Sequence, residues 1–111
     1  MREPKLLLKD ILEAISAIER FVEGISFEDF RTNDEKSSAV IRKFEIIGEA
    51  TKGLPEDLKE KHPEILWKEM AGFRDKLIHF YFGVKYELVW QAIKQRLPQI
   101  KSLIQKILED Q

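Results

Sequence analysis

Apolar residues recur at helical spacing from one end of this 111-residue chain to the other, and this pattern constrains the fold more than any other feature. No segment shows the sustained alternation of apolar and polar residues that is typical of a half-buried strand. We find no internal repeat and no linker long enough to separate two domains. The sequence therefore predicts an all-α protein, a four-to-five-helix antiparallel bundle in which residues 1–111 form a single domain.

Proline, glycine and capping residues indicate where the helices begin and end. Pro4 suits the first turn of a helix, whereas Gly24 and the step Gly53-Leu54-Pro55 are typical helix ends. Pro98 lacks a backbone donor, so we expect a kink or a break there within the last helix. Residues 26–33 should form a connection or a short helical turn. The expected helices span residues 4–24, 34–52, 55–61, 63–82 and 86–109.

Charge and cysteine content exclude several classes of protein. The formal net charge is −1, so a general basic coat for nucleic acid is not expected. The basic residues of the last helix are interpreted as a solvated face. The chain has no cysteine, which excludes disulfide bonds and thiolate-bound metals and fits a reducing compartment. No apolar run approaches the ~18 residues of a membrane span, and no signal-peptide pattern is present, so we expect a soluble cytoplasmic protein.

The run from Arg74 to Tyr81 carries more chemistry than a helix needs in order to fold. It places a guanidinium, an imidazole and a phenol close together, and His79 is one of only two histidines in the chain. Arg74 can neutralise charge on a phosphoryl group, and His79 can transfer a proton near neutral pH. Arg74 and His79 are therefore the candidate catalytic residues for chemistry on a phosphodiester that needs no metal and no cofactor.

In an ideal helix this run presents two apolar faces. The core-facing side consists of Leu66, Met70, Phe73 and Leu77. The far side consists of Asp75, Ile78, His79 and Phe82. Because exposed apolar residues usually require a partner surface, we expect a homodimer whose groove contains His79. Arg74 and His79 are ~140° apart in an ideal helix, so the long arginine arm, a distorted helix or a second subunit must bring them together.

Three acidic residues are candidates for supporting roles. Asp75 precedes His79 by one helical turn and can orient its imidazole. Glu45 and Glu49 are also one turn apart, and one of them is expected to hold Arg74 in place. A metal site built from these glutamates and His79 is not favoured, because no H-E-x-x-H-like spacing is present and Arg74 would oppose a cation.

The motif and its flanking segments resemble a known family. Arg74, His79 and Tyr81 match the R-x4-H-x-Y motif of the HEPN superfamily in its HepT-like branch. The segments 44–50 and 67–82, Trp90 and the step Leu97-Pro98 resemble the same branch, so the resemblance covers nearly the whole chain. Asp75 departs from the family pattern, which often has asparagine there, and this acid lowers the local positive potential.

The resemblance implies an all-α homodimer with the motif at the dimer cleft. It implies a metal-independent endoribonuclease, the toxin of a toxin–antitoxin pair, with RNA as its substrate and a small MNT-type nucleotidyltransferase antitoxin as its partner. That antitoxin would neutralise the toxin by transferring AMP from ATP to Tyr81, which would otherwise position RNA. Two alternatives stay open: a non-catalytic subunit that binds nucleotide or partner in a nucleotidyltransferase complex, and a plain helical dimerisation module.

Overall fold

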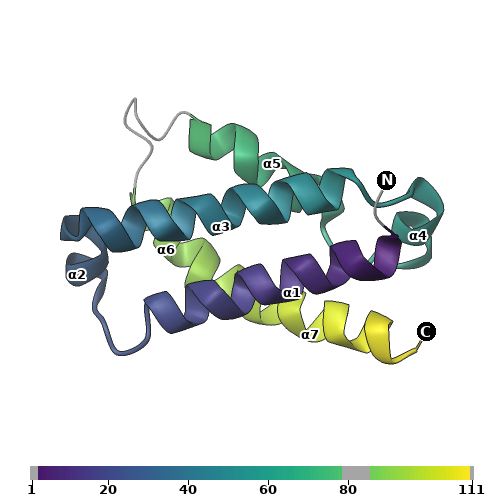
Figure 1. Ribbon diagram of the computed structural model, residues 1–111, viewed down its shortest axis with the longest axis horizontal. Coiled ribbons are helices and arrows are strands. Elements are labelled where there is room, and N and C mark those ends of the chain that lie inside the picture. Colours follow the sequence, from purple (N-terminus) through teal and green to yellow (C-terminus); the bar gives the residue numbers. More distant parts are fainter. Residues whose placement is uncertain (1–2, 79–85, 111) are drawn as a thin grey trace.

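The computed structural model describes residues 3–78 and 86–110, and within α5 it describes side chains as far as Phe73. Every regular element in these ranges is helical (Figure 1). The elements are α1 (Pro4–Phe21), α2 (Phe27–Thr32), α3 (Asp34–Lys52), α4 (Glu56–Lys61), α5 (Trp67–Ile78), α6 (Tyr86–Gln91), the π-helical segment η2 (Ala92–Arg96) and α7 (Leu97–Glu109). The prediction of an all-α fold is confirmed.

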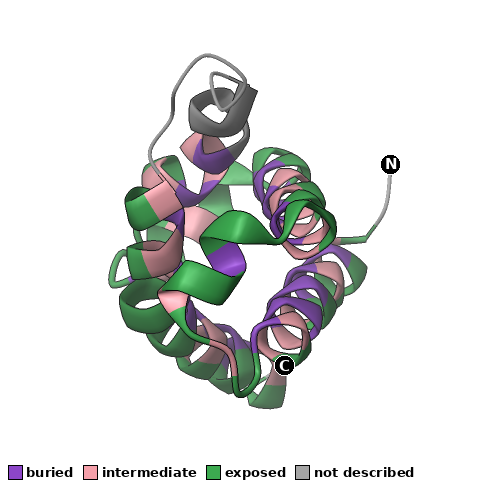
Figure 2. Cartoon of the chain, turned by 90° about the vertical axis from the view of Figure 1, so that its left-hand side faces the viewer, coloured by how far each residue is buried: buried purple, intermediate pink, exposed green. Residues whose placement is uncertain are grey.

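The long helices form an antiparallel bundle. α3 packs against α1 on one side and α5 on the other, and α7 packs against α1. Successive long helices run in opposite directions, so α1 and α5 point one way while α3 and α7 point the other (Figure 1). Viewed along the bundle, buried residues face the space enclosed by the helices and exposed residues face outward (Figure 2).

The buried side chains of α1 and α3 follow the apolar stripes of the sequence. Those of α1 include Leu8, Ile11, Ile15 and Ile18, all without exposed surface. Those of α3 include Val40, Phe44, Ile47 and Thr51. The hydroxyl of Thr51 donates a hydrogen bond of 2.7 Å to the carbonyl oxygen of Ile47, so this buried polar group is satisfied within its own helix.

Two predicted boundaries are wrong. α1 ends at Phe21 rather than Gly24, and Gly24 (φ +73°) lies in the following turn, where its left-handed backbone conformation suits a residue without a Cβ. α5 begins at Trp67 rather than Pro63. The indole Nε1 of Trp67 donates to the carbonyl oxygens of Lys59 (3.2 Å) and His62 (3.0 Å), which ties residues 62–66 into a turn.

One core assignment in this region is also wrong. Leu66 was expected on the core-facing side of the motif helix, but it precedes α5 and is 54% exposed. Met70 and Phe73, from the same expected face, are buried as predicted. The expected end of this helix at residue 82 lies outside the described residues.

Pro98 distorts the last helix, as the sequence predicts. η2 directly precedes α7, in which Pro98 occupies the first turn. A proline ring conflicts with the carbonyl group four residues earlier, here that of Lys94, and the wider π-helical turn relieves this conflict. The chain therefore stays helical from Tyr86 to Glu109 and changes its winding instead of breaking.

Across residues 3–78 and 86–110, no helix combines the length and apolar content that crossing a bilayer requires.

Candidate functional site

α5 carries the beginning of the candidate catalytic motif. Arg74 and Asp75 lie in its second half, and the helix continues to Ile78. The side chains of Arg74 and Asp75 lie outside the described part of the structure, as do His79 and Tyr81 altogether. The convergence of Arg74 with His79 therefore stays a prediction, and the described residues define the scaffold around it.

An aromatic pair fixes this part of α5 on α3. The rings of Phe44 and Phe73 meet edge to face, with centroids 5.1 Å apart and an interplanar angle of 82°. Both residues are buried, and Met70 is buried completely one turn earlier in α5. Phe73 immediately precedes Arg74, and Phe44 immediately precedes Glu45. The aromatic pair thus brings the beginning of the motif to the segment of α3 that carries the candidate acids.

The two candidate glutamates of α3 have different surroundings. Glu45 is half-buried, and its carboxylate accepts a hydrogen bond of 3.3 Å from Nη1 of Arg42. Glu49 is exposed and lines a pocket of about 240 Å³ together with Leu7 and Asp10 of α1. The packing of α3 between two helices thus places Glu49 at the α1 side. Which of the two glutamates holds Arg74 stays a prediction, because the Arg74 side chain lies outside the described part of the structure.

Metal sites in proteins are usually built from several His, Cys, Asp or Glu side chains that lie close together. Among the side chains that the structure describes, which exclude those of residues 74–85, no group of three or more His, Cys, Asp or Glu could hold a metal ion. His62, the other histidine of the chain, lies in the turn between α4 and α5, where Nδ1 is 3.5 Å from Oε1 of Glu64.

Three basic residues between Tyr86 and Glu109 have partners in the structure. Nζ of Lys94 lies 4.8 Å from the ring centroid of Trp90, and Nε of Arg96 is 3.2 Å from Oε1 of Glu69. Lys101 forms an ion pair of 2.6 Å with Glu19 of α1. Arg96 and Lys101 are thus paired with acidic side chains, and Lys94 and Lys106 are exposed, which agrees with the interpretation as a solvated face.

Comparison with known proteins agrees with the motif and the fold. The family model described as "Ribonuclease HepT-like" matches residues 11–107. The chain belongs to the HepT-like ribonuclease family. It is 50% identical over 106 residues to a Thermococcus cleftensis protein named "Probable ribonuclease HepT", and the match covers 96% of each chain. No solved structure matches the chain.

Two further relatives are named "Putative RNase". One, from Caldanaerobacter subterraneus subsp. tengcongensis, is 44% identical over 109 residues, with 98% of this chain and 97% of that protein covered. Another, from Methanocaldococcus jannaschii, is 47% identical over 109 residues, with 98% and 90% covered. The resemblance to the HepT-like branch is thereby confirmed over nearly the full length of the chain.

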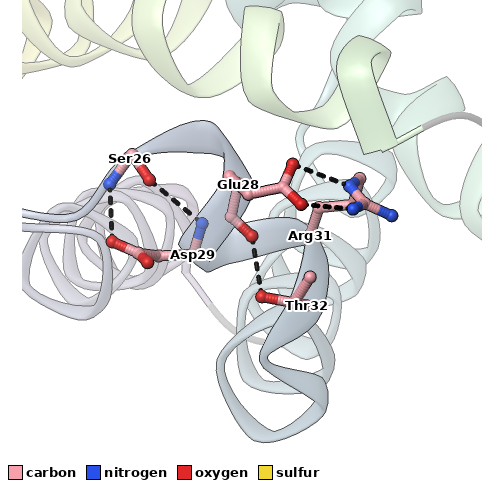
Figure 3. Close-up of polar contacts among 5 residues, drawn as sticks. All are labelled: Ser26, Glu28, Asp29, Arg31 and Thr32. Atoms are coloured by element: carbon pink, nitrogen blue, oxygen red, sulfur yellow. Dashed lines mark hydrogen bonds and ion pairs between the residues drawn. The ribbon is translucent and has the colours of Figure 1, made fainter.

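This HepT-like chain contains a short helix, α2, whose importance the sequence analysis missed. Its first turn is closed by a capping box, in which Ser26 Oγ accepts from the backbone N–H of Asp29 and Asp29 Oδ2 accepts from that of Ser26, both at 3.1 Å (Figure 3). Thr32 Oγ1 donates a 2.8 Å hydrogen bond to the carbonyl oxygen of Glu28. The signal was present in the sequence, because a serine followed three residues later by an acid is typical of a helix start.

An ion pair within α2 faces the beginning of α6. Arg31 donates to both carboxylate oxygens of Glu28, with Nε at 3.1 Å from Oε2 (Figure 3). The hydrogen bond from Arg31 lowers the pKa of Glu28 below its ordinary value, and the same bond raises the pKa of Arg31. Glu87 and Tyr86 raise the pKa of Arg31 further, so its guanidinium lies within electrostatic range of α6.

Gly72 is not needed for packing within the described structure. It lies in α5 two residues before Arg74, and an added Cβ would meet no described atom within 4 Å. Because alanine is the better helix former, Gly72→Ala should raise the free energy of unfolding by about 0.5–1 kcal/mol. Urea unfolding monitored by circular dichroism measures the change. The reverse substitution in the neighbouring position, Ala71→Gly, should lower it, and a destabilised Gly72→Ala would contradict the expectation.

Proposed function

We propose that this protein is a metal-independent endoribonuclease and the toxin of a toxin–antitoxin pair. The observation that carries the proposal is membership of the HepT-like ribonuclease family, together with an intact R-x4-H-x-Y motif that begins in α5. We propose further that residues 1–111 are one domain, supported by a core to which α1, α3, α5 and α7 all contribute. A cytoplasmic location fits an RNA substrate and a chain without cysteine.

The proposed reaction uses the RNA's own 2′-hydroxyl as the nucleophile. A bond forms between the 2′-oxygen and phosphorus while the bond from phosphorus to the 5′-oxygen of the next nucleotide breaks. His79 takes the proton from the 2′-hydroxyl or gives one to the departing 5′-oxygen. Arg74 stabilises the negative charge that develops on the phosphoryl oxygens. In a homodimer, the two copies of His79 can hold complementary protonation states and perform both transfers.

The described scaffold supports separate roles for the three acids. Glu45 is the better candidate to hold Arg74, because it directly follows Phe44, which contacts Phe73 of α5. Glu49 lines a pocket with residues of α1 and is proposed as a further supporting acid. Asp75 is one turn before His79 and is proposed to orient its imidazole.

Tyr81 is proposed to be the control point of the toxin. Transfer of AMP from ATP to its phenol, by an MNT-type nucleotidyltransferase antitoxin, would add bulk and negative charge close to Arg74 and His79. An RNA phosphate carries the same charge, so it would be excluded both sterically and electrostatically. Tyr81 would otherwise help to position RNA.

The proposal is tested with purified protein and a single-stranded RNA in the presence of EDTA. We expect internal cleavage that leaves 2′,3′-cyclic phosphate ends, because the 2′-hydroxyl attack requires no metal. Incubation with a cognate nucleotidyltransferase and ATP should add one or more AMP units by intact-mass measurement and abolish cleavage. Tyr81→Phe should remain unmodified. Cleavage that depends on an added divalent cation would reject the mechanism.

The same experiment distinguishes a second candidate function from the ribonuclease function. Asp75, in place of the asparagine common in the family, lowers the positive potential beside the motif. This substitution favours a non-catalytic subunit that binds nucleotide or partner in a nucleotidyltransferase complex. Such a subunit would accept AMP without cleaving RNA, whereas a plain dimerisation module would do neither.

A further inference from the structure

A groove of about 500 Å³ lies between the second half of α1 and the segment where η2 passes into α7 (Figure 1). We name it the α1–η2 groove. Two of its lining side chains, Val22 and Ile93, are buried, so its floor is apolar. Its volume lies within the range of about 300–1,000 Å³ that is usual for ligand sites in proteins.

The charged side chains that line the groove are only partly paired. Lys101 and Glu19 form an ion pair of 2.6 Å across it and neutralise each other. Arg20 and Lys94 are exposed and line the groove from opposite elements. Among the residues that the structure describes, no acid lies within ion-pair distance of Arg20 or Lys94. Glu23 is the remaining acid of the lining, so two available cations stand against one carboxylate.

An aromatic ring adjoins the groove. Nζ of Lys94 lies 4.8 Å from the centroid of the Trp90 ring, and this indole is only half-buried. The ring of Phe27, also half-buried, lies 6.0 Å from that of Trp90. Proteins that bind single-stranded nucleic acid combine a positively charged groove, which follows the backbone, with aromatic side chains against which the bases stack. Both parts of that combination meet at Lys94.

We propose that the α1–η2 groove binds a single strand of RNA, with Arg20 and Lys94 contacting phosphate groups and a base lying against Trp90. A free phosphate ion would leave the apolar floor uncovered, and the bases of an RNA duplex are stacked inside the helix, where the indole cannot reach them. The choice of occupant rests on the proposed ribonuclease function. The groove gives the RNA substrate a contact apart from the candidate catalytic motif.

Binding is measured by the fluorescence anisotropy of a labelled single-stranded 2′-O-methyl RNA, which lacks the nucleophilic hydroxyl and therefore cannot be cleaved by the proposed reaction. The double variant Arg20→Gln/Lys94→Gln should bind about tenfold or more weakly than the parent at low salt. Its plot of log affinity against log salt should be shallower by about 1.4, because each phosphate contact on a single strand contributes about 0.7. The matched control is Lys5→Gln/Lys9→Gln, which removes the same charge from exposed positions at the other end of α1 and should bind as the parent does.

Two further readouts report on the groove itself. Glu23→Gln removes the carboxylate that opposes a phosphate, so it should tighten binding, whereas Glu60→Gln at an exposed position of α4 should not. RNA that reaches Lys94 must also lie close to Trp90, so binding should quench the tryptophan fluorescence of the parent. The quenching should disappear in Trp90→Phe, because the other tryptophan, Trp67, is 8% exposed.

Each outcome decides the proposal. Equal losses of affinity in the two double variants overturn it, because the overall charge then explains binding. A parent protein that does not bind the RNA, or that binds it without quenching, overturns it too. If the parent binds RNA through the groove but cleaves none in EDTA, the proposed function fails and the groove remains a binding site. If the parent cleaves RNA and Arg20→Gln/Lys94→Gln binds and cleaves equally well, the groove proposal fails and the proposed function stands.

Discussion

Replacing His79 with alanine should lower the rate of RNA cleavage by about 10²–10⁴-fold, the range typical of losing one general acid or base. The physical reason is that the alanine side chain can neither accept the 2′-hydroxyl proton nor supply one to the leaving oxygen. The stability of the bundle should change little, because helical spacing predicts His79 on the side of the motif helix away from the core-facing residues. Single-turnover cleavage of a labelled RNA in EDTA, at saturating protein, measures the chemical step.

His62 provides a matched control for this substitution. It is the only other histidine of the chain and lies in the turn between α4 and α5. His62→Ala should therefore cleave RNA at the parental rate. Arg74→Lys completes the series, because it keeps a positive charge but loses the planar fork that matches two phosphoryl oxygens. A folded His79→Ala variant with parental activity would exclude His79 as the proton carrier.

The fold was predictable wherever burial alone determines the structure. Leu8, Ile11 and Ile15 recur on one face of α1, and hydrophobic burial is strong enough to make such a stripe decisive. The start of α5 was not predictable in this way. It depends on hydrogen bonds from the indole of Trp67 to two carbonyl oxygens of the preceding turn, and no periodic pattern encodes them. Leu66 is exposed for the same reason.

The chemistry of the candidate site stays a prediction from the sequence, whereas the surroundings of its glutamates come from the structure. The one-turn spacing of Glu45 and Glu49 suggested a single acidic pair, whereas the packing of α3 between α1 and α5 gives them different neighbours. The contacts of Phe30 with Tyr86 and Trp90 join segments far apart along the chain. Local periodicity carries no information on such pairs, so these contacts emerge only from the tertiary structure.

Among the single substitutions named for this protein, Phe44→Ala should cause the largest loss of stability. We expect the free energy of unfolding to fall by about 3–5 kcal/mol. The residue is 2% exposed and meets Phe73 edge to face, so alanine would leave a cavity between α3 and α5. Total stabilities of domains are only about 5–15 kcal/mol, so this loss should produce a marked fall in the urea midpoint. Circular dichroism at increasing urea concentration measures it.

A graded comparison separates the aromatic contact from simple loss of volume. Phe44→Leu should cost less than Phe44→Ala, and combining Phe44→Leu with Phe73→Leu in a double-mutant cycle should reveal a coupling of about 0.5–1.5 kcal/mol. Glu13→Ala, at an exposed position of α1, should stay within about 0.5 kcal/mol of the parent. A coupling near zero would mean that Phe44 stabilises the bundle without holding α5 to α3 through Phe73. The contact that holds the beginning of the motif to α3 would then have to lie elsewhere in the interface between α3 and α5.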